Sequence, residues 1–267
     1  MKIGIIGLGF VGGAMLKSFN LKNIETYCYD KFKNNGIGQI EELTVCDIIF
    51  LCLPTLYDNN KNEYNKDAIN EVCQFLNDKN FKGIVVLKST VEPETNNLLS
   101  NKYKNLKLIH NPEFLTARTA FEDLHNQSHI VIGKGINCNN GEDEIVKDFY
   151  KRHYSHAEIS MCTSTESESM KIMCNSFYAS KIMLFNEYYL LCKKNNTDFN
   201  KIKELMLKNN WINEMHTTIP GPDGELGYGG ACFPKDTNAL CQYMKKHNIN
   251  CSVLQAVIEE RNTLRND

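Results

Sequence analysis

Several features that define other protein classes are scarce or missing in this chain. No apolar run approaches the ~18 residues that a membrane-spanning helix requires, so we expect no membrane partner. The formal net charge is −2, which offers no basic surface to nucleic acid or an anionic membrane. The opening segment, Met1–Gly7, is too short and too interrupted by glycine for a signal peptide. These features favour a soluble, cytoplasmic globular protein.

The cysteines are numerous but lack the spacing of a metal site or a disulfide framework. Eleven are scattered along 267 residues, without a C-x-x-C pair or a His/Cys cluster at zinc spacing. We therefore predict no metal site. An odd number of cysteines without an export signal indicates free thiols in a reducing compartment, most of them small core hydrophobes.

Apolar runs and helical patterns alternate over the first ~150 residues, which is typical of βαβ units. We predict an α/β fold with a Rossmann-like, doubly wound, mostly parallel sheet that helices cover on both faces. The predicted strands are Lys2–Ile6, Glu25–Tyr29, Asp47–Leu53, Gly83–Leu87, Leu106–Ile109 and Ile130–Ile132. Two of the predicted intervening helices are Val11–Phe19 and Asp67–Leu76.

The pattern changes after Ile159. Residues 164–194 contain few helix breakers and carry apolar residues at helical spacing, which predicts one long spine helix between domains or between subunits. Shorter helices are predicted at Asn200–Leu207, Asp236–Lys246 and Ser252–Leu264. We therefore predict a nucleotide-binding domain at 1–160 and a mainly helical domain at 161–267.

A glycine-rich turn follows the first predicted strand and opens the first predicted helix. Residues 7–12 read G-x-G-x-x-G, and Asp30 ends the next predicted strand 18 residues after Gly12. Gly7 permits the tight turn, Gly9 lets a pyrophosphate approach the backbone, and Gly12 lets helix and strand pack closely. A turn that merely requires glycines is the weaker interpretation, because motif, context and carboxylate agree.

The carboxylate of Asp30 favours NAD over NADP. It can accept hydrogen bonds from ribose hydroxyls and repels a 2′-phosphate, although Lys31 and Lys33 keep NADP open. Further cofactor contacts are predicted in the helix start and at two strand ends, where ligands of open α/β sheets bind. These residues are Phe10, Val11, Pro54, Thr55, Ser89 and Thr90. For Ser89, a helix cap is an equal alternative.

One cysteine stands in an unusual context. Cys232 lies between a glycine-rich loop and Pro234, and proline is well placed in a first helical turn. We therefore predict Cys232 at a helix N-terminus, where the dipole favours a thiolate, with Asp236 one turn further on the same face. This arrangement indicates a prepared nucleophile. The alternative, a packed core thiol, is our interpretation of the other ten cysteines.

Lys171 and Asn175 are spaced i, i+4, so they project from one face of the predicted long helix. Taken alone, a solvated lysine is the simpler interpretation of Lys171. The motifs that accompany Lys171 in the sequence favour a role in the site instead.

Several motifs in order resemble a known family. They are Gly7–Gly12, Leu53–Thr55, Lys88–Val91, Asn111–Leu115, Lys171 with Asn175, and Gly229–Asp236. Together they are similar to the nucleotide-sugar 6-dehydrogenases, the UDP-glucose/GDP-mannose dehydrogenase family, over essentially the whole chain. The resemblance implies oxidation of a sugar's primary alcohol to a carboxylate in two NAD-dependent steps.

The resemblance also implies roles for individual residues. Cys232 would attack the C6 aldehyde, giving a thiohemiacetal, then a thioester that water hydrolyses. Lys171 and Asn175 would stabilise the developing oxyanion, and Asp236 would orient a water. Thr90 and Glu113 would assist proton transfer and hydrolysis.

The family resemblance further implies which residues bind the two ligands. Lys235 would contact the nicotinamide side of NAD. Two loops would hold a UDP-sugar together with Lys171, Asn175 and Cys232, and the long helix would pair two subunits into a homodimer. The loop residues are Glu113, Phe114, Leu115, Thr116, Tyr228, Gly229 and Gly230.

Two departures from the family pattern are visible. Ala117, followed by Arg118, occupies a position where the family usually has a second glutamate. The sequence ends at Asp267, whereas family members usually continue into another nucleotide-binding-like domain, so we expect a shortened form with weaker substrate affinity.

Four functions remain in competition. The first is oxidation of UDP-glucose, and the second is the same chemistry on UDP-N-acetylhexosamine or GDP-mannose. The third, a one-step hydroxyacid dehydrogenase, needs no cysteine nucleophile and is disfavoured by the Cys232 motif. The fourth, a non-catalytic NAD-binding remnant, is disfavoured because the catalytic set is present together.

Overall fold

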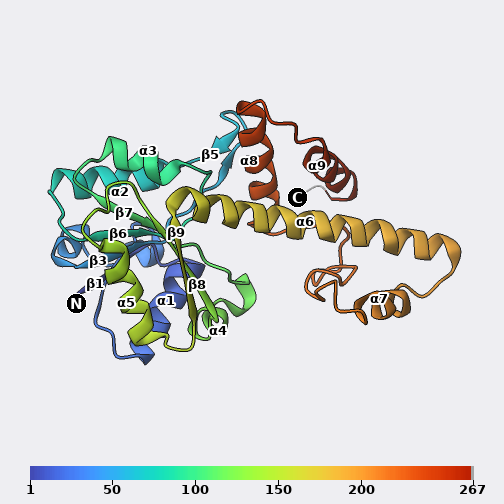
Figure 1. The fold of residues 1–267 in the computed structure, drawn as a ribbon, viewed down its shortest axis with the longest axis horizontal. Coiled ribbons are helices and arrows are strands. Elements are labelled where there is room, and N and C mark those ends of the chain that lie inside the picture. Colours follow the sequence, from blue (N-terminus) through green and yellow to red (C-terminus); the bar gives the residue numbers. More distant parts are fainter. Residues whose placement is uncertain (266–267) are drawn as a thin grey trace. The chain divides into compact units, whose positions relative to one another are not determined.

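The computed structural model describes residues 1–265, which divide into two compact units (Figure 1). Unit 1 comprises Met1–Leu56 and Tyr64–Lys171. Unit 2 comprises Tyr57–Glu63 and the residues from Ile172 onward. The long helix α6 (Ser164–Asn195) contributes residues to both units.

A seven-stranded sheet forms the centre of unit 1. Its strands are β1 (Ile3–Ile6), β2 (Thr26–Tyr29), β3 (Ile48–Leu51), β6 (Ile84–Leu87), β7 (Lys107–His110), β8 (His129–Lys134) and β9 (Glu158–Thr163). They lie in the order β2-β1-β3-β6-β7-β8-β9, and every neighbouring pair is parallel except β7 with β8. The predicted mostly parallel, Rossmann-like sheet is therefore confirmed.

Two features of the sheet were not predicted. The antiparallel β7–β8 pairing reverses the last two strands, and β9 adds an edge. The four inner residues of β9 are only half-buried and both ends are exposed, and its sequence, EISMCT, has no continuous apolar run from which a strand could be predicted.

Helices cover both faces of the sheet, as predicted. The helices are α1 (Phe10–Leu21), α2 (Asp67–Asp78), α3 (Thr95–Lys102), α4 (Ala120–His125) and α5 (Glu142–His153), with short 3-10 helices η1 (Lys33–Asn35), η2 (Ile40–Val45) and η3 (Ala117–Thr119). Successive strand residues point to opposite faces. Ile48 and Phe50 accordingly pack with α1, α4 and α5, whereas Ile49 and Leu51 pack with η2, α2 and α3.

Unit 2 contains the remainder of α6, α7 (Phe199–Leu207), α8 (Phe233–Lys246) and α9 (Ser252–Leu264). Phe185 of α6 packs with Phe199 at the start of α7, and Ala179 and Met183 of α6 pack with Tyr228. The segment Tyr57–Glu63 of this unit contains β4 (Tyr57–Asp58) and the first residue of β5 (Glu63–Tyr64). These two strands form a separate two-stranded sheet. In the described part of the chain, no helix combines the length and apolarity needed to cross a membrane.

Candidate functional site

A pocket of about 440 Å³ opens in unit 1 where β1, β3 and β6 end. Seven of the predicted cofactor residues line it: Gly7, Gly9, Phe10, Val11, Asp30, Pro54 and Ser89. Gly12, Thr55 and Thr90 do not line it but lie beside lining residues in the sequence or contact them. Lys235 belongs to unit 2.

Two of the three glycines of the turn, Gly7 and Gly12, are required by close backbone contacts. Gly7 has a φ of +87°, and a Cβ there would lie 2.4 Å from the Cys52 carbonyl oxygen. A Cβ on Gly12 would lie 1.8 Å from the Gly7 oxygen, so only glycine lets α1 start this close to β1. A Cβ on Gly9, the N-cap of α1, would meet nothing within 4 Å. This open backbone at a helix N-terminus fits a dinucleotide pyrophosphate.

Asp30 holds the same turn through its carboxylate. Its Oδ2 accepts a hydrogen bond from Leu8 N at 2.7 Å, and Oδ1 accepts from Phe32 N and Lys33 N. Partial burial raises the pKa of Asp30, but these backbone donors and the Lys33 charge outweigh it and lower the pKa overall. The carboxylate is therefore ionised at neutral pH and lines the pocket.

The two lysines that left NADP open are engaged with the protein. Lys31 Nζ forms an ion pair with Glu71 at 2.7 Å, and Lys33 Nζ donates to the Leu8 carbonyl. Both ammonium groups are therefore bound to other groups of the protein and not positioned to bind a 2′-phosphate. The pocket thus fits NAD.

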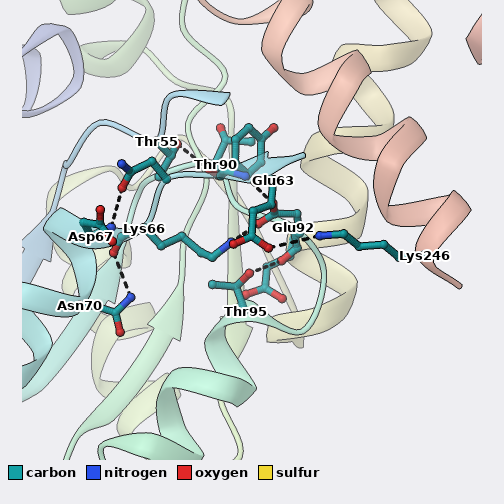
Figure 2. A network of polar contacts seen from close by, with 12 residues as sticks. Thr55, Glu63, Lys66, Asp67, Asn70, Thr90, Glu92, Thr95 and Lys246 are labelled. Carbon is teal, nitrogen blue, oxygen red and sulfur yellow. Dashed lines mark hydrogen bonds and ion pairs between the residues drawn. The ribbon is translucent and has the colours of Figure 1, made fainter. Parts of the chain in front are cut away.

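Polar residues at the strand ends tie two loops together. Ser89 Oγ donates to the Leu53 carbonyl at 2.7 Å and accepts from Leu53 N at 3.1 Å. Thr55 Oγ1 donates to the Thr90 carbonyl at 2.7 Å (Figure 2). The alternative role of Ser89 as a helix cap is wrong, because α3 begins six residues later with Glu94 as its N-cap.

Glu92 joins this strand-end loop to the segment after β5. Its Oε1 accepts from Tyr64 N at 2.7 Å, its Oε2 lies 3.0 Å from Lys66 Nζ, and its carbonyl accepts from Thr95 Oγ1 (Figure 2). Within unit 2, Lys246 of α8 pairs with Glu63 at 3.2 Å (Figure 2). Sequence reasoning missed this network, since carboxylates in a loop ordinarily indicate solvent.

A second polar group in unit 1 surrounds Lys171. This lysine is only 4% exposed, so its interpretation as a solvated side chain is wrong. Its Nζ lies 3.3 Å from Glu113 Oε1 and 5.4 Å from the centroid of the Phe114 ring. Glu113 Oε2 accepts from Leu115 N at 2.6 Å, and the structure thereby brings Lys171 against the predicted substrate loop.

The rest of that loop is held by local bonds. Thr116 N donates to Asp123 Oδ2 at 2.8 Å, and Ala117 opens the exposed helix η3. Ala117 carries no carboxylate, and within the described residues Lys171 pairs with Glu113.

Cys232 is the N-cap of α8, with Pro234 in the first turn. The predicted helix N-terminus is confirmed, and α8 begins at Phe233, three residues before the predicted start. The thiol residue is exposed, whereas the other ten cysteines are buried or half-buried, so the core-thiol alternative is wrong for Cys232.

Asp236 lies beneath this helix start and is fully buried. Its Oδ2 accepts from Asn175 Nδ2 and its Oδ1 pairs with Lys235 Nζ, both at 2.5 Å. Unit 2 therefore assembles Asn175, Lys235 and Asp236 beside the exposed Cys232. The arrangement can hold a carboxylate and an amide in fixed orientation next to a nucleophile.

The glycine loop before Cys232 is anchored by its tyrosine. Tyr228 is 2% exposed, its hydroxyl lies 3.3 Å from Thr237 Oγ1, and its carbonyl accepts from Arg261 Nε. A Cβ on Gly229 would lie 2.5 Å from the Arg265 guanidinium, and Gly230 has a φ of +79°. The buried Tyr228 ring leaves the backbone of this loop as the part that can face a ligand.

The described residues contain no cluster of three or more His, Cys, Asp or Glu side chains that could hold a metal ion. The polar chemistry of both units rests on lysine, asparagine, carboxylate and thiol groups. Two buried groups to which the sequence analysis gave no role, Lys88 and His110, also lie in unit 1.

Comparisons with known proteins relate most of the chain to one family. Residues 38–154 match the NAD binding domain of the UDP-glucose/GDP-mannose dehydrogenase family, and residues 165–263 match its central domain. NAD is therefore the cofactor of this chain.

Individual relatives extend this similarity. UDP-glucose 6-dehydrogenase of Campylobacter jejuni is 27% identical over 97% of this chain and 71% of its own length. The enzyme of that name from Rickettsia felis is 34% identical over 74% of this chain, which spans 43% of the relative. The structure of a UDP-glucose dehydrogenase from Pyrobaculum islandicum superposes with a TM-score of 0.83 at 22% identity, covering 98% of this chain and 68% of that one. The chain belongs to the UDP-glucose/GDP-mannose dehydrogenase family.

Proposed function

We propose that this chain oxidises the C6 hydroxymethyl group of UDP-glucose to a carboxylate in two successive NAD-dependent steps. The observation that carries the proposal is the exposed Cys232 at the N-terminus of α8, next to the buried Asp236 that Asn175 and Lys235 hold. A one-step dehydrogenase requires no such thiol. NAD, when bound, accepts one hydride in each oxidation.

The protein's residues divide the remaining chemistry. The Cys232 thiolate adds to the C6 aldehyde and forms a thiohemiacetal, whose oxidation gives a thioester. A water oriented by Asp236 then cleaves the thioester C–S bond, which releases the carboxylic acid and regenerates the thiol. The helix dipole at the α8 N-terminus favours the thiolate in both the attack and the release.

Lys171 and Asn175 stabilise negative charge on the C6 oxygen. The Lys171 ammonium lies 3.3 Å from Glu113 Oε1, and the Asn175 amide is oriented by its hydrogen bond to Asp236. Glu113 and Thr90 assist the proton transfers, and the 113–116 loop together with the backbone of 228–230 binds the sugar nucleotide. Lys235 contributes on the nicotinamide side of the cofactor.

We also propose that the chain forms a homodimer. Five large apolar residues of α6 are 37–65% exposed at spacings of four, seven, four and three residues, which places them along one helix face: Met173, Phe177, Leu184, Tyr188 and Leu191. A continuous exposed apolar stripe favours a second copy of the chain as its cover. The many cysteine thiols are consistent with a reducing, cytoplasmic location.

The test is the number of NADH molecules formed per UDP-glucose consumed at completion. We expect two, with UDP-glucuronate as the product. Cys232→Ala should abolish the carboxylate product, whereas Cys162→Ala, which removes a half-buried thiol from β9, should not. If Cys232→Ala still formed two NADH per UDP-glucose, Cys232 would not be the nucleophile.

Parallel reactions with UDP-N-acetylglucosamine, UDP-N-acetylmannosamine and GDP-mannose test the alternative substrates. Oxidation of one of these in place of UDP-glucose would retain the thiol mechanism and change the substrate. No NADH from any of the four would contradict the catalytic proposal and favour the non-catalytic NAD-binding alternative.

A further inference from the structure

Lys88 is a buried lysine at the end of β6 to which the proposed mechanism gives no role. It lines the cofactor pocket, yet it is only 4% exposed. Its Nζ donates to Asn111 Oδ1 at 2.9 Å and lies 3.4 Å from the Pro112 carbonyl oxygen. The ammonium therefore contacts the two residues that immediately precede Glu113 in the sequence.

Two further hydrogen bonds fix Asn111, the residue to which Lys88 donates. Tyr150 of α5 donates its hydroxyl to Asn111 Oδ1 at 2.5 Å, and Asn111 Nδ2 donates to the Val131 carbonyl at 2.6 Å. Asn111 is 1% exposed. Lys88 is thus the charged member of a buried clamp that joins β6, α5 and β8 to the substrate loop.

Five titratable groups surround the Lys88 ammonium. Cys52 lies at the end of β3, Glu113 in the loop after β7 and Lys171 on α6. His110 of β7 also lies within electrostatic range, but burial lowers its pKa to about 3, so it is neutral at working pH. Tyr150 of α5 contributes a neutral hydroxyl, since burial raises its pKa well above the usual value.

The charges around the clamp do not cancel. Two ammonium groups, Lys88 and Lys171, share the single carboxylate of Glu113. Burial lowers the pKa of Lys88 to about 8; Cys52 and Glu113 oppose this shift, and Lys171 adds to it. A partly desolvated excess of positive charge is suited to stabilising an anionic oxygen in a reaction.

We propose that Lys88 is a positioning residue for the oxidation, holding Asn111 and Pro112 so that Glu113 stays against Lys171 and supplying the second positive charge behind that pair. This inference rests on the proposed function. It means that the reaction requires Lys88 in its protonated form. Because the lysine loses its proton as the pH rises through its pKa, activity declines on the alkaline side.

Rates of NADH formation between pH 6.5 and 10 test the inference. We expect kcat of the unaltered protein to fall above about pH 8. Lys88→Met should lower kcat at least ~10-fold at pH 7, since loss of one fixed electrostatic group commonly costs that much or more, and should remove the alkaline decline. Lys88→Arg, whose side chain stays charged, should keep activity and move the decline upward.

Lys82→Met is the matched control, because Lys82 is an exposed lysine just before the same strand. It should leave both kcat and the pH profile unchanged. A Lys88→Met protein with the unaltered protein's kcat and alkaline decline would overturn the inference.

Hydrogen exchange of residues 111–116 tests the clamp without any turnover. We expect faster exchange of these amides in Lys88→Met and not in Lys82→Met, with the amides of β1 unchanged in both as evidence of an intact fold. Unchanged exchange at 111–116 would overturn the positioning role. If the unaltered protein forms no NADH from any nucleotide sugar, the proposed function fails, and the exchange result still decides the clamp.

Discussion

Glu168 should make the stability of this protein fall as the pH rises. The residue lies in the second turn of α6 and is fully buried. Its Oε1 accepts from Asn96 N at 2.7 Å, whereas its Oε2 has no hydrogen-bond partner among the described residues. Burial raises the pKa of Glu168 from 4.5 to about 8, against the backbone donors of Asn96 and Glu94.

The sign follows from proton linkage. Between pH 4.5 and 8 the folded state keeps a proton that the unfolded state releases, so the free energy of unfolding falls as the pH rises. Each pH unit in this window costs at most about 1.4 kcal/mol. From pH 5 to pH 8 the ionisation of Glu168 should therefore destabilise the protein by about 3 kcal/mol.

Glu168→Gln isolates this effect. The amide keeps an acceptor for Asn96 N and carries no titrating proton. In urea unfolding at pH 5, 6.5 and 8, followed by circular dichroism, the variant should gain stability over the unaltered protein by about 3 kcal/mol as the pH rises from 5 to 8. Comparing the two proteins at each pH cancels the titration of every other group.

Glu166→Gln is the control. Glu166 is exposed, and its carboxylate accepts from Thr163 N and Thr163 Oγ1, which lower its pKa. It is ionised in both states from pH 5 to 8, so its replacement should shift stability equally at all three values. A Glu168→Gln difference that is the same at pH 5 and pH 8 would refute the reasoning, as would a variant less stable than the unaltered protein at pH 8.

Two further predictions concern ligand binding and assembly. Asp30→Ala should weaken NAD binding roughly 10- to 100-fold, the usual value of a charged hydrogen-bonding group; fluorescence titration with NADH measures this, and unchanged affinity would contradict the role of Asp30. Phe177→Glu combined with Leu184→Glu should convert a dimer to monomers in sedimentation velocity, because two charges cannot be buried in an apolar interface without partners; Leu21→Glu, at an exposed position of α1, should not. A dimer that survives both charges would place the subunit contact elsewhere.

Local patterns allowed most elements of the fold to be predicted. All six predicted strands are present, with end points that differ by at most two residues, and the helix predicted at Ser252–Leu264 is observed with those bounds. These segments have continuous apolar runs or clear helical spacing, and such patterns depend only on neighbouring residues. The two-residue strands β4 and β5 offered no run of that kind.

The same distinction between local and distant determinants applies to the buried and site residues. The Gly7–Gly12 turn and the helix start at Cys232 are built from adjacent residues, so their geometry could be predicted. Lys88, Glu168 and His110 could not, because their burial depends on strands and helices that are distant in the sequence. A charged residue between apolar ones is normally solvated, and nothing in its own neighbourhood shows that another element will cover it.

Helix α6 inverts the usual relation between polarity and burial. Glu168 and Lys171 are buried near its start, while Phe177 and Leu184 further along are 65% and 49% exposed. Burying the ammonium of Lys171 costs free energy that ordinary packing does not return, so a fold selected for stability alone would place an apolar residue there. Lys171 is then explained by the chemistry that we propose for the site, and the exposed apolar residues by the homodimer that we propose. The two proposals predict different effects of substitution: polar replacements of the exposed apolar residues of α6 should affect assembly, whereas an apolar replacement of Lys171 should affect catalysis.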